Sequence, residues 1–564
     1  MALSQRLDVP EIVGRVLSAR GVSPENGEKF LNPTLRDHLP DPSGFVDMDK
    51  AADRIASAIA AGERVAVFGD YDVDGATSTA VLKRFFDAVR GNLTIYIPDR
   101  MTEGYGPNAP ALLRLREQGV SVVITVDCGT TAYAPLAEAT AAGLDVVVID
   151  HHQAEPQLPE VYALVNPNRL DESGQFGQLA AVGVTYLLII AVNRRLRENG
   201  WYRGEIGEPD LLRWLDLVAL GTICDVVPLT GLNRALVTQG LRVMARRGNP
   251  GLVALADVAG VHDRPGAYHA GYVLGPRVNA GGRVGKSDLG ARLLSTTSSS
   301  EAQEIAIELD RHNKERQAIE AMVEQSAFAV MEARIGDSTP GPLVLAVGEG
   351  WHPGVIGIVA SRLRERYRRP AFVIALEGGI GKGSGRSIPG VDLGAAVTAA
   401  KQAGLLINGG GHKMAAGITV EVAQIGALSE FLTARLTLEV DSAADQNSLG
   451  FDGALAVEGA TTDLLEMIDR AGPYGSGNTE PRFAIARARV VKSDLVGNGH
   501  VRCILAGQGG GRLKAIAFRA ADNPLGQCLL RPEGRSFHIA GHLRANNWRG
   551  ETNVQLTVED AAQA

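Results

Sequence analysis

The strongest constraint on the fold is an alternation of short apolar runs and helical patterns between residues 64 and 150. The apolar runs, rich in β-branched residues, are “RVAVFGD”, “LTIYIPD”, “VSVVITVDCG” and “LDVVVIDHH”. Segments with a helical spacing of apolar residues separate them. Continuous apolar strands that alternate with helices predict a parallel sheet covered on both faces. The region is therefore predicted to form an α/β domain.

The chain is too long for one hydrophobic core, because 564 residues exceed the roughly 100–200 residues of a typical domain. A helical pattern that starts at Ser300, with Gln303 completing a capping box, predicts one connecting helix about 50 Å long. A second α/β pattern follows it, and short strands with glycine turns then predict a β-barrel. The predicted segments are an N-terminal helical segment (1–45), the first α/β domain (46–299), the connecting helix (300–335), the second α/β domain (336–446) and the barrel (447–564).

The composition is that of a globular protein without a membrane segment. The net charge of −8 gives no overall signal for nucleic acid, although a local basic groove remains compatible with it. The cysteines are scattered without a CxxC pair, which disfavours a zinc knuckle and a disulfide framework and fits a reducing cytoplasm. The N-terminus lacks the apolar core of a signal peptide, and the apolar runs are too short to span a bilayer. We therefore expect a cytoplasmic protein that does not bind membranes.

Acidic and imidazole groups follow three of the four predicted strands. They are Asp70, Asp72, Asp74, Asp127, Asp150, His151 and His152. In an open parallel sheet, ligands bind beyond the carboxyl ends of the strands, so these groups are expected to meet at one edge. One aspartate at a strand end is ordinarily a turn or cap residue. So many carboxylates would repel one another, and the sequence therefore predicts bound cations.

Carboxylates with imidazole suit Mn²⁺ or Mg²⁺ better than thiol-selected metals. Several carboxylates can hold two ions about 3.5–4 Å apart, which is the arrangement used for phosphoryl transfer. Asp225, in “LVALGTICDVVPL”, has two interpretations: a turn residue before proline, or a ligand at a fourth strand end.

Three later features are candidates for nucleic-acid binding. “GKGSGRS” is either a glycine-rich loop that cradles phosphate or a flexible turn. “GGGH” is either a helix cap or a place of close backbone approach. The barrel resembles an OB-fold, which binds single strands by stacking and a basic groove. Trp548 and Arg549 are candidates for that contact, unless the tryptophan packs within its hairpin.

“DYDVDG”, “VDCG”, “DHH” and “GTICDVVPL” occur in the order found in the DHH phosphoesterase superfamily. Within it, the chain resembles the RecJ family over residues 40–564. The motifs that carry this resemblance are “IPDRMTEGYGPN”, “GPRVNAGGR”, “GWHPGVIGIVASRL”, “GKGSGRS”, “GGGHKMAAG” and “GPYGSGNTEP”. The chain departs from the family pattern at Gly281, where the family motif NAAGR has alanine, and at Thr479, where proline is expected. Neither position is a predicted metal ligand.

The resemblance implies a single-stranded-DNA-specific 5′→3′ exonuclease that uses two divalent ions, Mn²⁺ or Mg²⁺, and releases 5′-mononucleotides in DNA repair and recombination. The implied ligands of one ion are Asp70, Asp72 and Asp127. The implied ligands of the other ion are Asp74, Asp127, His151 and Asp225. With His152 near the scissile phosphate, the implied catalytic residues are Asp72, Asp74, Asp127, His151, His152 and Asp225.

The resemblance also implies residues that hold DNA. Those near the cut are Arg277 and Asn279. Those at the 5′ end are Ser384, Arg386 and Ser387. The same channel would be lined by Gly410, Gly411 and His412, and the barrel would add Trp548. The expected partners are single-stranded DNA, a single-strand-binding protein and a helicase, with the protein itself a monomer.

Two other functions remain open on the sequence. A DHH phosphoesterase could act on short oligoribonucleotides or cyclic dinucleotides, but such enzymes generally lack the barrel and the “GPRVNAGGR” region. An inactive DHH scaffold could bind single strands or partner proteins. That would require lost ligands, whereas each expected ligand position is filled here.

Overall fold

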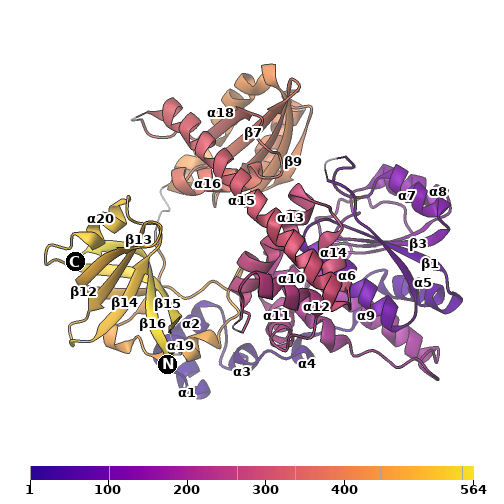
Figure 1. Ribbon diagram of the computed structural model, residues 1–564, viewed down its shortest axis with the longest axis horizontal. Helices are drawn as coiled ribbons and strands as arrows, with labels where there is room; N and C mark the ends of the chain where they lie inside the picture. Colours follow the sequence, from indigo (N-terminus) through magenta and orange to yellow (C-terminus); the bar gives the residue numbers. More distant parts are fainter. Residues whose placement is uncertain (1, 101, 263, 337, 445–447, 549–550) are drawn as a thin grey trace. The chain divides into compact units, whose positions relative to one another are not determined.

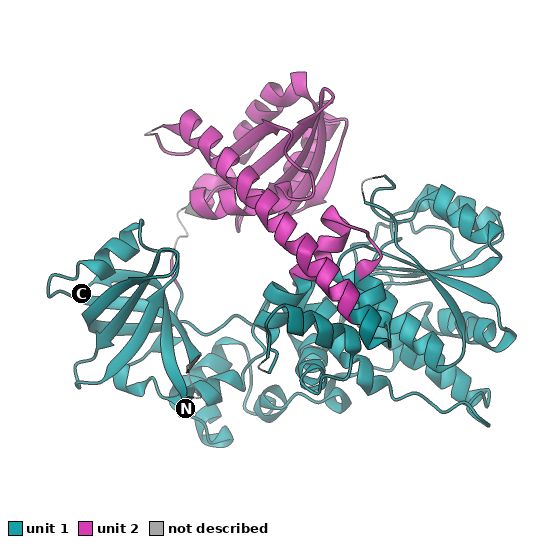
Figure 2. Ribbon diagram, viewed as in Figure 1, with its two compact units in different colours: residues 1–275, 290–302, 450–564 teal, residues 276–289, 303–449 magenta. Residues whose placement is uncertain are grey.

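The computed structural model describes residues 2–100, 102–262, 264–336, 338–444, 448–548 and 551–564. The chain divides into two compact units (Figure 2). Unit 1 comprises residues 1–275, 290–302 and 450–564, and unit 2 comprises residues 276–289 and 303–449. The first α/β domain and the barrel thus belong to one unit, and the second α/β domain to the other. The finer boundaries of the five predicted segments stay predictions.

Unit 1 contains the predicted parallel sheet. Its strands are β1 (Arg64–Gly69), β2 (Asn92–Tyr96), β3 (Val120–Val126), β4 (Asp145–Ile149) and β5 (Ala163–Val165). They lie in the order β2-β1-β3-β4-β5, and every neighbouring pair is parallel. The covering helices are α5 (Met48–Ala61), α6 (Val73–Ala88), α7 (Ala109–Glu117), α8 (Tyr133–Ala141) and α9 (Ala181–Glu198). Helices α7 and α8 cover one face, and α5, α6 and α9 cover the other (Figure 1).

Local sequence signals set the helix ends in this domain. The side chain of Asn108 accepts a hydrogen bond from Ala111 N at the start of α7, where Pro110 occupies the first turn. The chain leaves that helix through Gly119, whose φ of +84° suits glycine. The remaining helices of unit 1 are mostly short. They are α1 (Ala2–Leu7), α2 (Glu11–Ala19), α3 (Gly27–Leu31), α4 (Leu35–His38), η1 (Pro42–Gly44), η2 (Leu211–Trp214), α10 (Leu215–Cys224), α11 (Gly231–Met244), α12 (Pro250–Val258), the π-helix η3 (His269–Leu274) and α14 (Leu289–Ser295).

The C-terminal part of unit 1 is a closed barrel. Its strands are β11 (Gly453–Ala454), β12 (Phe483–Val496), β13 (His500–Ala506), β14 (Arg512–Ala517), β15 (Ser536–Trp548) and β16 (Glu551–Gln563), with η5 (Val457–Gly459), α19 (Thr462–Asp469) and α20 (Pro524–Leu530). The order is β11-β12-β13-β14-β16-β15, and a β12–β15 pairing closes the ring. This five-stranded closure, with β11 added at one side, is the architecture expected of an OB-fold.

The N-terminal helices pack against this barrel. Val13, Val16 and Leu17 of α2 belong to the same buried apolar cluster as the barrel residues Phe483 and Phe537. The chain's N-terminal helical segment therefore completes a core that is formed mainly by its C-terminal strands.

Unit 2 begins with most of α13 (Gly275–Val284) and most of the long helix α15 (Ser299–Ile335). Helix α15 has 37 residues, one more than the predicted range 300–335, and is roughly 55 Å long. The predicted capping box is wrong in register, because the Oγ that accepts a hydrogen bond from Glu301 N is that of Ser298, not Ser300.

The second sheet lies in unit 2. Its strands are β6 (Val344–Glu349), β7 (Ala371–Glu377), β8 (Ile380–Arg386), β9 (Asn408–His412) and β10 (Ala415–Glu421), in the order β6-β7-β8-β10-β9. Its helices are α16 (Ile356–Tyr367), α17 (Leu393–Gln402), η4 (Val422–Gln424) and α18 (Ile425–Ala444). The sheet is mixed, because β6 and β7 are parallel and the other pairs antiparallel. The predicted fold class, two α/β domains, a connecting helix and a barrel, is confirmed.

Two glycine-rich motifs are strands rather than loops. The loop predicted for “GKGSGRS” is wrong, because these residues form most of β8. Its alternate glycines leave room for neighbouring side chains: a Cβ on Gly383 would lie 2.6 Å from Ile418, and one on Gly385 would lie 2.5 Å from Phe372. “GGGH” belongs to β9, so a helix cap is excluded. The close backbone approach holds at Gly411, where a Cβ would lie 2.4 Å from Ala415 O.

Arg234 on α11 links three parts of unit 1. Its guanidinium donates hydrogen bonds to the backbone carbonyls of Phe30, Ala471 and Gly472, and lies 3.9 Å from the centroid of the Phe30 ring. The residue is 2% exposed, and burial lowers its pKa to about 10. The N-terminal segment, the first α/β domain and the segment before the barrel therefore share one buried cation.

We expect Arg234→Met to destabilise unit 1 by about 2–4 kcal/mol, because charged hydrogen bonds are lost and buried carbonyls are left unpaired. Calorimetry should show a lower melting temperature, with the barrel and the α/β domain melting further apart. Arg242→Met, an exposed arginine on the same helix, is the control and should leave the trace unchanged. If the two variants had equal melting temperatures, a linking role for Arg234 would be contradicted.

Candidate metal centre and nucleic-acid interface

Three neighbouring strand ends of the parallel sheet carry acidic or imidazole side chains. Asp70 follows β1, Asp127 follows β3, and His151 lies two residues beyond β4. The last residues of these three strands are paired in register. Groups that are far apart in the sequence therefore meet at one edge of the sheet, as predicted.

The turn from β1 into α6 brings three carboxylates close together. Asp72 caps the helix, and its Oδ1 accepts hydrogen bonds from Asp74 N at 2.9 Å and Gly75 N at 3.2 Å. A Cβ on Gly75 would lie 2.5 Å from the carbonyl oxygen of Asp70 and 2.7 Å from its Cα. Glycine at this position therefore lets the first turn of α6 approach the end of β1.

Asp74 is held by the start of another helix. Its Oδ2 accepts a hydrogen bond from Ala181 N at 2.7 Å, and its Oδ1 accepts one from Val182 N at 2.8 Å. Both donors lie in the first turn of α9, where backbone N–H groups lack partners within the helix and the helix dipole favours an anion. The carboxylate is fully buried, and its orientation is fixed.

Side-chain atoms suited to metal coordination form three groups, each within 4.8 Å. The groups are Asp70 with Asp72 and Asp127, Asp74 with His151 and Asp225, and Asp127 with His151 and His152. Nε2 of His151 lies 3.3 Å from Asp127 Oδ1 and 3.6 Å from Asp225 Oδ2. Among the residues that the structure describes, this nitrogen has no hydrogen-bond partner, nor do the buried oxygens Asp70 Oδ1 and Asp225 Oδ2. Buried polar atoms are normally paired, so these atoms fit cations that they would coordinate directly.

Repulsion between the clustered carboxylates is evident in their raised pKa values. Burial and the neighbouring carboxylates raise the pKa of Asp74 to about 7 and that of Asp225 to about 9. The same two causes raise the pKa of Asp70 and of Asp127 well above the usual range. Divalent cations would favour the charged forms, and carboxylates with one imidazole are the donor set that Mn²⁺ and Mg²⁺ prefer.

The two adjacent histidines differ in charge. Burial and the charge of His152 lower the pKa of His151 to about 4, so His151 is neutral, as a ligand must be. Burial alone would lower the pKa of His152, but Asp150, 2.7 Å away, raises it to about 9 through a hydrogen bond and its charge. His152 is therefore a cation at neutral pH. Asp150 itself stays charged, because His152 holds its pKa below the usual range despite burial.

Several residues that shape the centre were missed by the sequence analysis. One of them is Thr130, whose backbone N–H donates a hydrogen bond to Asp150, an aspartate that the sequence analysis did name; the N–H of His151 donates to the same carboxylate. Asn166 donates to His152 O at 2.8 Å, and Asn168 donates to the carbonyl of His151. Asn166 directly follows β5, so its place at a strand end was a signal for it. A further contact, from Tyr105 Oη to Asp127 O at 3.0 Å, has no comparable sequence signal.

Asp225 reaches the cluster from a helix and not from a strand. It is the C-terminal cap of α10, so the predicted fourth strand end is wrong. The apolar sequence around it fits a buried helix as well as a strand, which is why it was misread. The next residue, Val226, has a φ of +62°, an unfavourable conformation for a β-branched side chain.

The predicted DNA-binding residues other than Trp548 lie in unit 2. Arg277 and Asn279 lie on α13, and Arg277 Nε is 3.0 Å from Asp310 Oδ1 on α15. Ser384, Arg386 and Ser387 lie on or just after β8, and Gly410, Gly411 and His412 lie on β9. Strand β10 lies between β8 and β9 and pairs with both, so the two motifs belong to one sheet.

Arg386 is the most distinctive of these residues. Its Nη1 donates to Gly385 O at 2.8 Å and to Ser384 Oγ at 3.2 Å. Within the described ranges it forms no ion pair with a carboxylate, and burial and the charge of Arg364 lower its pKa. A Cβ on Gly357, in the first turn of α16, would lie 3.0 Å from both Arg386 Nη2 and Ser384 Oγ. Ser387, in contrast, is fully buried and donates its hydroxyl to Val391 O.

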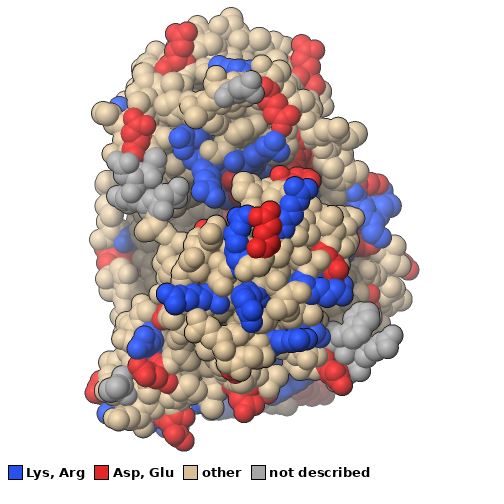
Figure 3. Space-filling model, turned by 90° about the vertical axis from the view of Figure 1, so that its left-hand side faces the viewer, with Lys and Arg blue, Asp and Glu red and all other residues tan. Residues whose placement is uncertain are grey.

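The barrel carries a basic outer face. Exposed cations on β12, β13 and β14 include Arg489, Lys492, Arg502, Arg512 and Lys514. Basic side chains are prominent on the side of the molecule where the barrel lies (Figure 3).

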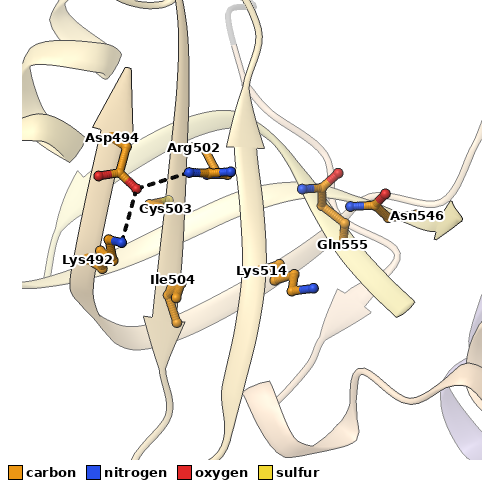
Figure 4. A pocket seen from close by; sticks show the side chains of 8 residues that line it. All are labelled: Lys492, Asp494, Arg502, Cys503, Ile504, Lys514, Asn546 and Gln555. Carbon is orange, nitrogen blue, oxygen red and sulfur yellow. Dashed lines mark hydrogen bonds and ion pairs between the residues drawn. The ribbon is translucent and has the colours of Figure 1, made fainter. Parts of the chain in front are cut away.

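A hollow of about 400 Å³ lies on the barrel strands (Figure 4). It is lined by Lys492, Asp494, Arg502, Cys503, Ile504, Lys514, Asn546 and Gln555. Asp494 lies 3.3 Å from Arg502 and 3.6 Å from Lys492, while Lys514 points to the other side of the hollow. The side chain of Trp548, and all of Arg549, lie outside the described residues.

Comparisons with known proteins identify each part of this architecture. The sheet with the acidic edge matches the DHH family, N-terminal domain, over residues 64–222. The second α/β domain matches the DHHA1 domain over residues 341–437, and the barrel matches the RecJ OB domain over residues 451–560. The fold and the site thus define a DHH-type phosphoesterase.

The single-stranded-DNA-specific exonuclease RecJ of Salmonella typhimurium is 34% identical to this chain, over 98% of the chain and 96% of that protein. The chain belongs to the RecJ family. The RecJ of Thermus thermophilus is 32% identical over 97% of the chain and 76% of that protein. A crystal structure of RecJ from Thermus thermophilus in complex with Mn²⁺ matches with a TM-score of 0.78 and 29% identity, over 100% of this chain and 77% of that one. Within the described ranges, every helix is too short or too polar to cross a membrane.

The raised pKa values predict how the metal-free protein responds to pH. Between the ordinary pKa of aspartate and the raised values, about 7 for Asp74 and about 9 for Asp225, the folded state binds more protons than the unfolded state. The free energy of unfolding then falls as pH rises, by up to about 1.4 kcal/mol per pH unit for each proton. The melting temperature in EDTA should fall between about pH 5 and about pH 8, and Asp225→Asn should reduce that fall. The control Asp87→Asn, at an exposed site on α6, should leave that fall unchanged. If the melting temperature fell equally with pH in the wild type and in both variants, repulsion among the buried carboxylates would be contradicted.

Proposed function

We propose that this protein is a metal-dependent exonuclease that degrades single-stranded DNA from the 5′ end to 5′-mononucleotides. The observation that carries the proposal is the cluster at the sheet edge, where buried carboxylate and imidazole atoms have no hydrogen-bond partner within the described ranges. Its place in a chain of the RecJ family, whose curated members are named single-stranded-DNA-specific exonucleases, supports this substrate. The proposed roles are DNA repair and recombination.

The proposed ligands form two sets that share Asp127. The sets are Asp70, Asp72 and Asp127 for one ion, and Asp74, Asp127, His151 and Asp225 for the other. The sharing is supported because Asp127 belongs to the first close group and also lies 3.3 Å from His151. When bound, two Mn²⁺ or Mg²⁺ ions supply positive charge to the scissile phosphate and the leaving oxygen, and they acidify water.

The chain's own residues orient these groups and hold the phosphate. The first turn of α9 fixes both oxygens of Asp74, so this ligand needs no rearrangement when a metal binds. Asp150 keeps His152 protonated up to a pKa of about 9, and the half-exposed imidazolium can donate a hydrogen bond to a phosphate oxygen. His152 is thus proposed as a phosphate contact, while the neutral His151 is a ligand.

The proposed partners are those expected of an exonuclease that acts on single-stranded DNA. The basic outer face of the barrel supports binding of single-stranded DNA, because such strands are held by cationic surfaces and stacking. Trp548 is proposed to contribute on the barrel, and Arg277 and Asn279 near the cut. A single-strand-binding protein and a helicase are proposed partners of a monomeric, cytoplasmic enzyme.

Cleavage of a labelled strand tests the function directly. With Mn²⁺, the protein should release 5′-mononucleotides from a 5′-phosphorylated single strand and leave a duplex of the same sequence largely intact. Asp127→Ala should lower kcat by more than the roughly 10–100-fold that loss of an outer-shell partner costs. Asp216→Asn removes an equally buried carboxylate of α10 outside the cluster and should stay active. Faster turnover of short RNA or cyclic dinucleotides would favour the other phosphoesterase function, and full activity of Asp127→Ala would refute the shared ligand.

Arg386 is the proposed anchor for the 5′-phosphate. It is half-buried without a carboxylate partner in the described part of unit 2, and Ser384 and the first turn of α16 lie against it. A guanidinium binds phosphate through two parallel hydrogen bonds, which fixes the end of a strand in position. Ser387 would support the shape of this site through its bond to Val391. Gly410, Gly411 and His412 are proposed to line the same channel.

Loss of this half-buried charge should cost about 2–5 kcal/mol in binding the end group, or roughly 30-fold to several-thousand-fold. Arg386→Ala should raise KM for 5′-phosphorylated strands and reduce the preference over 5′-hydroxyl strands, while metal binding stays unchanged. The measurement is the ratio of kcat/KM on the two substrates. Lys382→Ala, which removes a cation on the same face of β8, is the control and should keep the ratio. If Arg386→Ala also keeps it, the anchor lies elsewhere.

A further inference from the structure

Asp127, at the end of β3, has an unusual backbone conformation. Its φ is +60°, in the left-handed region that residues with a side chain rarely adopt. Aspartate tolerates this region better than most residues, but such a conformation persists only where the surrounding structure supports it. The residue is 3% exposed, and its Oδ1 lies 3.3 Å from His151 Nε2. Because φ sets the direction of the Cα–Cβ bond, this conformation decides where the carboxylate points.

Two hydrogen bonds hold the backbone of Asp127. Its N–H donates to Ile149 O on β4 at 3.1 Å, which continues the pairing of β3 with β4. Its carbonyl oxygen lies 3.0 Å from Tyr105 Oη. A carbonyl oxygen can only accept, so the hydroxyl of Tyr105 is the donor. The first bond comes from the sheet itself, and the second comes from the segment between β2 and α7.

That segment is tied to the elements on both sides of it. Glu103 accepts a hydrogen bond from Tyr96 Oη on β2 at 2.6 Å and another from Arg114 Nη2 on α7 at 2.9 Å. Tyr105 follows two residues after this anchor. The hydroxyl that reaches Asp127 therefore starts from a point fixed on the same sheet.

The side chain of Tyr105 contributes little to the hydrophobic core. It is 56% exposed, so most of its apolar area stays in solvent. Its ring meets that of His152 edge to face, with centroids 6.2 Å apart and planes at 73°. The hydroxyl, in contrast, contacts the backbone of a buried residue. These contacts indicate that the side chain acts on the carboxylate cluster and not on the packing of the domain.

We propose that Tyr105 is a positioning residue for the metal centre. Its hydroxyl holds the carbonyl of Asp127 and so keeps this residue in the left-handed conformation that directs its carboxylate toward both groups of ligands. This inference rests on the proposed function, in which Asp127 is shared by the two ions. Because one ligand serves both ions, loss of its alignment weakens the binding of both. The hydroxyl has no role in binding the strand.

The test compares Tyr105→Phe with Tyr202→Phe. The first variant removes the hydroxyl and keeps the ring beside His152. Tyr202 donates its hydroxyl to Asn193 Oδ1, near the other end of α9 from Asp74, so it is the control for loss of a half-buried hydroxyl in unit 1. Isothermal titration of each protein with Mn²⁺, without nucleic acid, measures the metal affinity. Tyr105→Phe should bind both ions roughly 10- to 100-fold more weakly, and Tyr202→Phe should bind them like the wild type.

Cleavage of a 5′-phosphorylated oligodeoxyadenylate separates positioning from contact with the substrate. Half-maximal activity of Tyr105→Phe should require a roughly 10- to 100-fold higher Mn²⁺ concentration than that of the wild type. At saturating Mn²⁺, kcat and KM should both return to wild-type values, because the hydroxyl touches neither the strand nor the reacting atoms. The melting temperature in EDTA should stay close to that of the wild type, since the ring is largely exposed.

Three results would overturn the positioning role: an unchanged Mn²⁺ affinity of Tyr105→Phe, a loss confined to one ion, or a change in kcat or KM that persists at saturating Mn²⁺. The wild type tests the proposed function separately. A wild type that binds Mn²⁺ and cleaves single strands, with a Tyr105→Phe variant that binds Mn²⁺ equally well, rejects the positioning role alone. A wild type that binds no Mn²⁺ rejects the proposed metal centre.

Discussion

Like charge concentrated at the carboxyl edge of a parallel sheet is the constraint on which the functional part of unit 1 depends. The carboxylates at this edge are stabilised in different ways. Asp72 caps α6, Asp74 accepts two N–H groups from α9, and Asp150 is neutralised by a protonated histidine. Asp70 and Asp225 instead have buried oxygens without hydrogen-bond partners in the described part of the chain. The first three are held by donors of the protein itself, whereas the last two are the ones that we propose bind cations directly.

The sequence predicted most of this edge, because parallel strands place their ends side by side whatever the connections between them. Asp70, Asp127 and His151 could be found by that rule alone. Asp225 could be suspected but not placed, since an apolar run of that length fits a helix or a strand. Tyr105 and Asn168 were not found, because they act through backbone carbonyls whose positions only the folded chain defines. The strand β8 was missed because glycine disfavours strands, and the side chains that fill the space above Gly383 and Gly385 come from elsewhere.

The barrel in unit 1 presents a surface whose interactions depend on salt. Its outer face carries exposed cations such as Arg502 and Lys514. Attraction between such cations and phosphate weakens as the salt concentration rises. The buried carboxylate cluster at the sheet edge is screened by salt much less, because its charges lie away from solvent. Ionic strength therefore separates the contribution of the barrel surface from that of the cluster.

The packing of the N-terminal helices into the barrel core has a consequence for how the chain is made. Residues of α2 such as Val13 and Leu17 share a buried cluster with Phe483 and Phe537, which are translated more than 450 residues later. At typical elongation rates of about 5–20 residues per second, these helices wait roughly half a minute or longer for the strands that cover them. Their apolar face is exposed throughout synthesis of both α/β domains. During that interval the nascent chain presents a surface that chaperones can bind, even though the finished protein buries it.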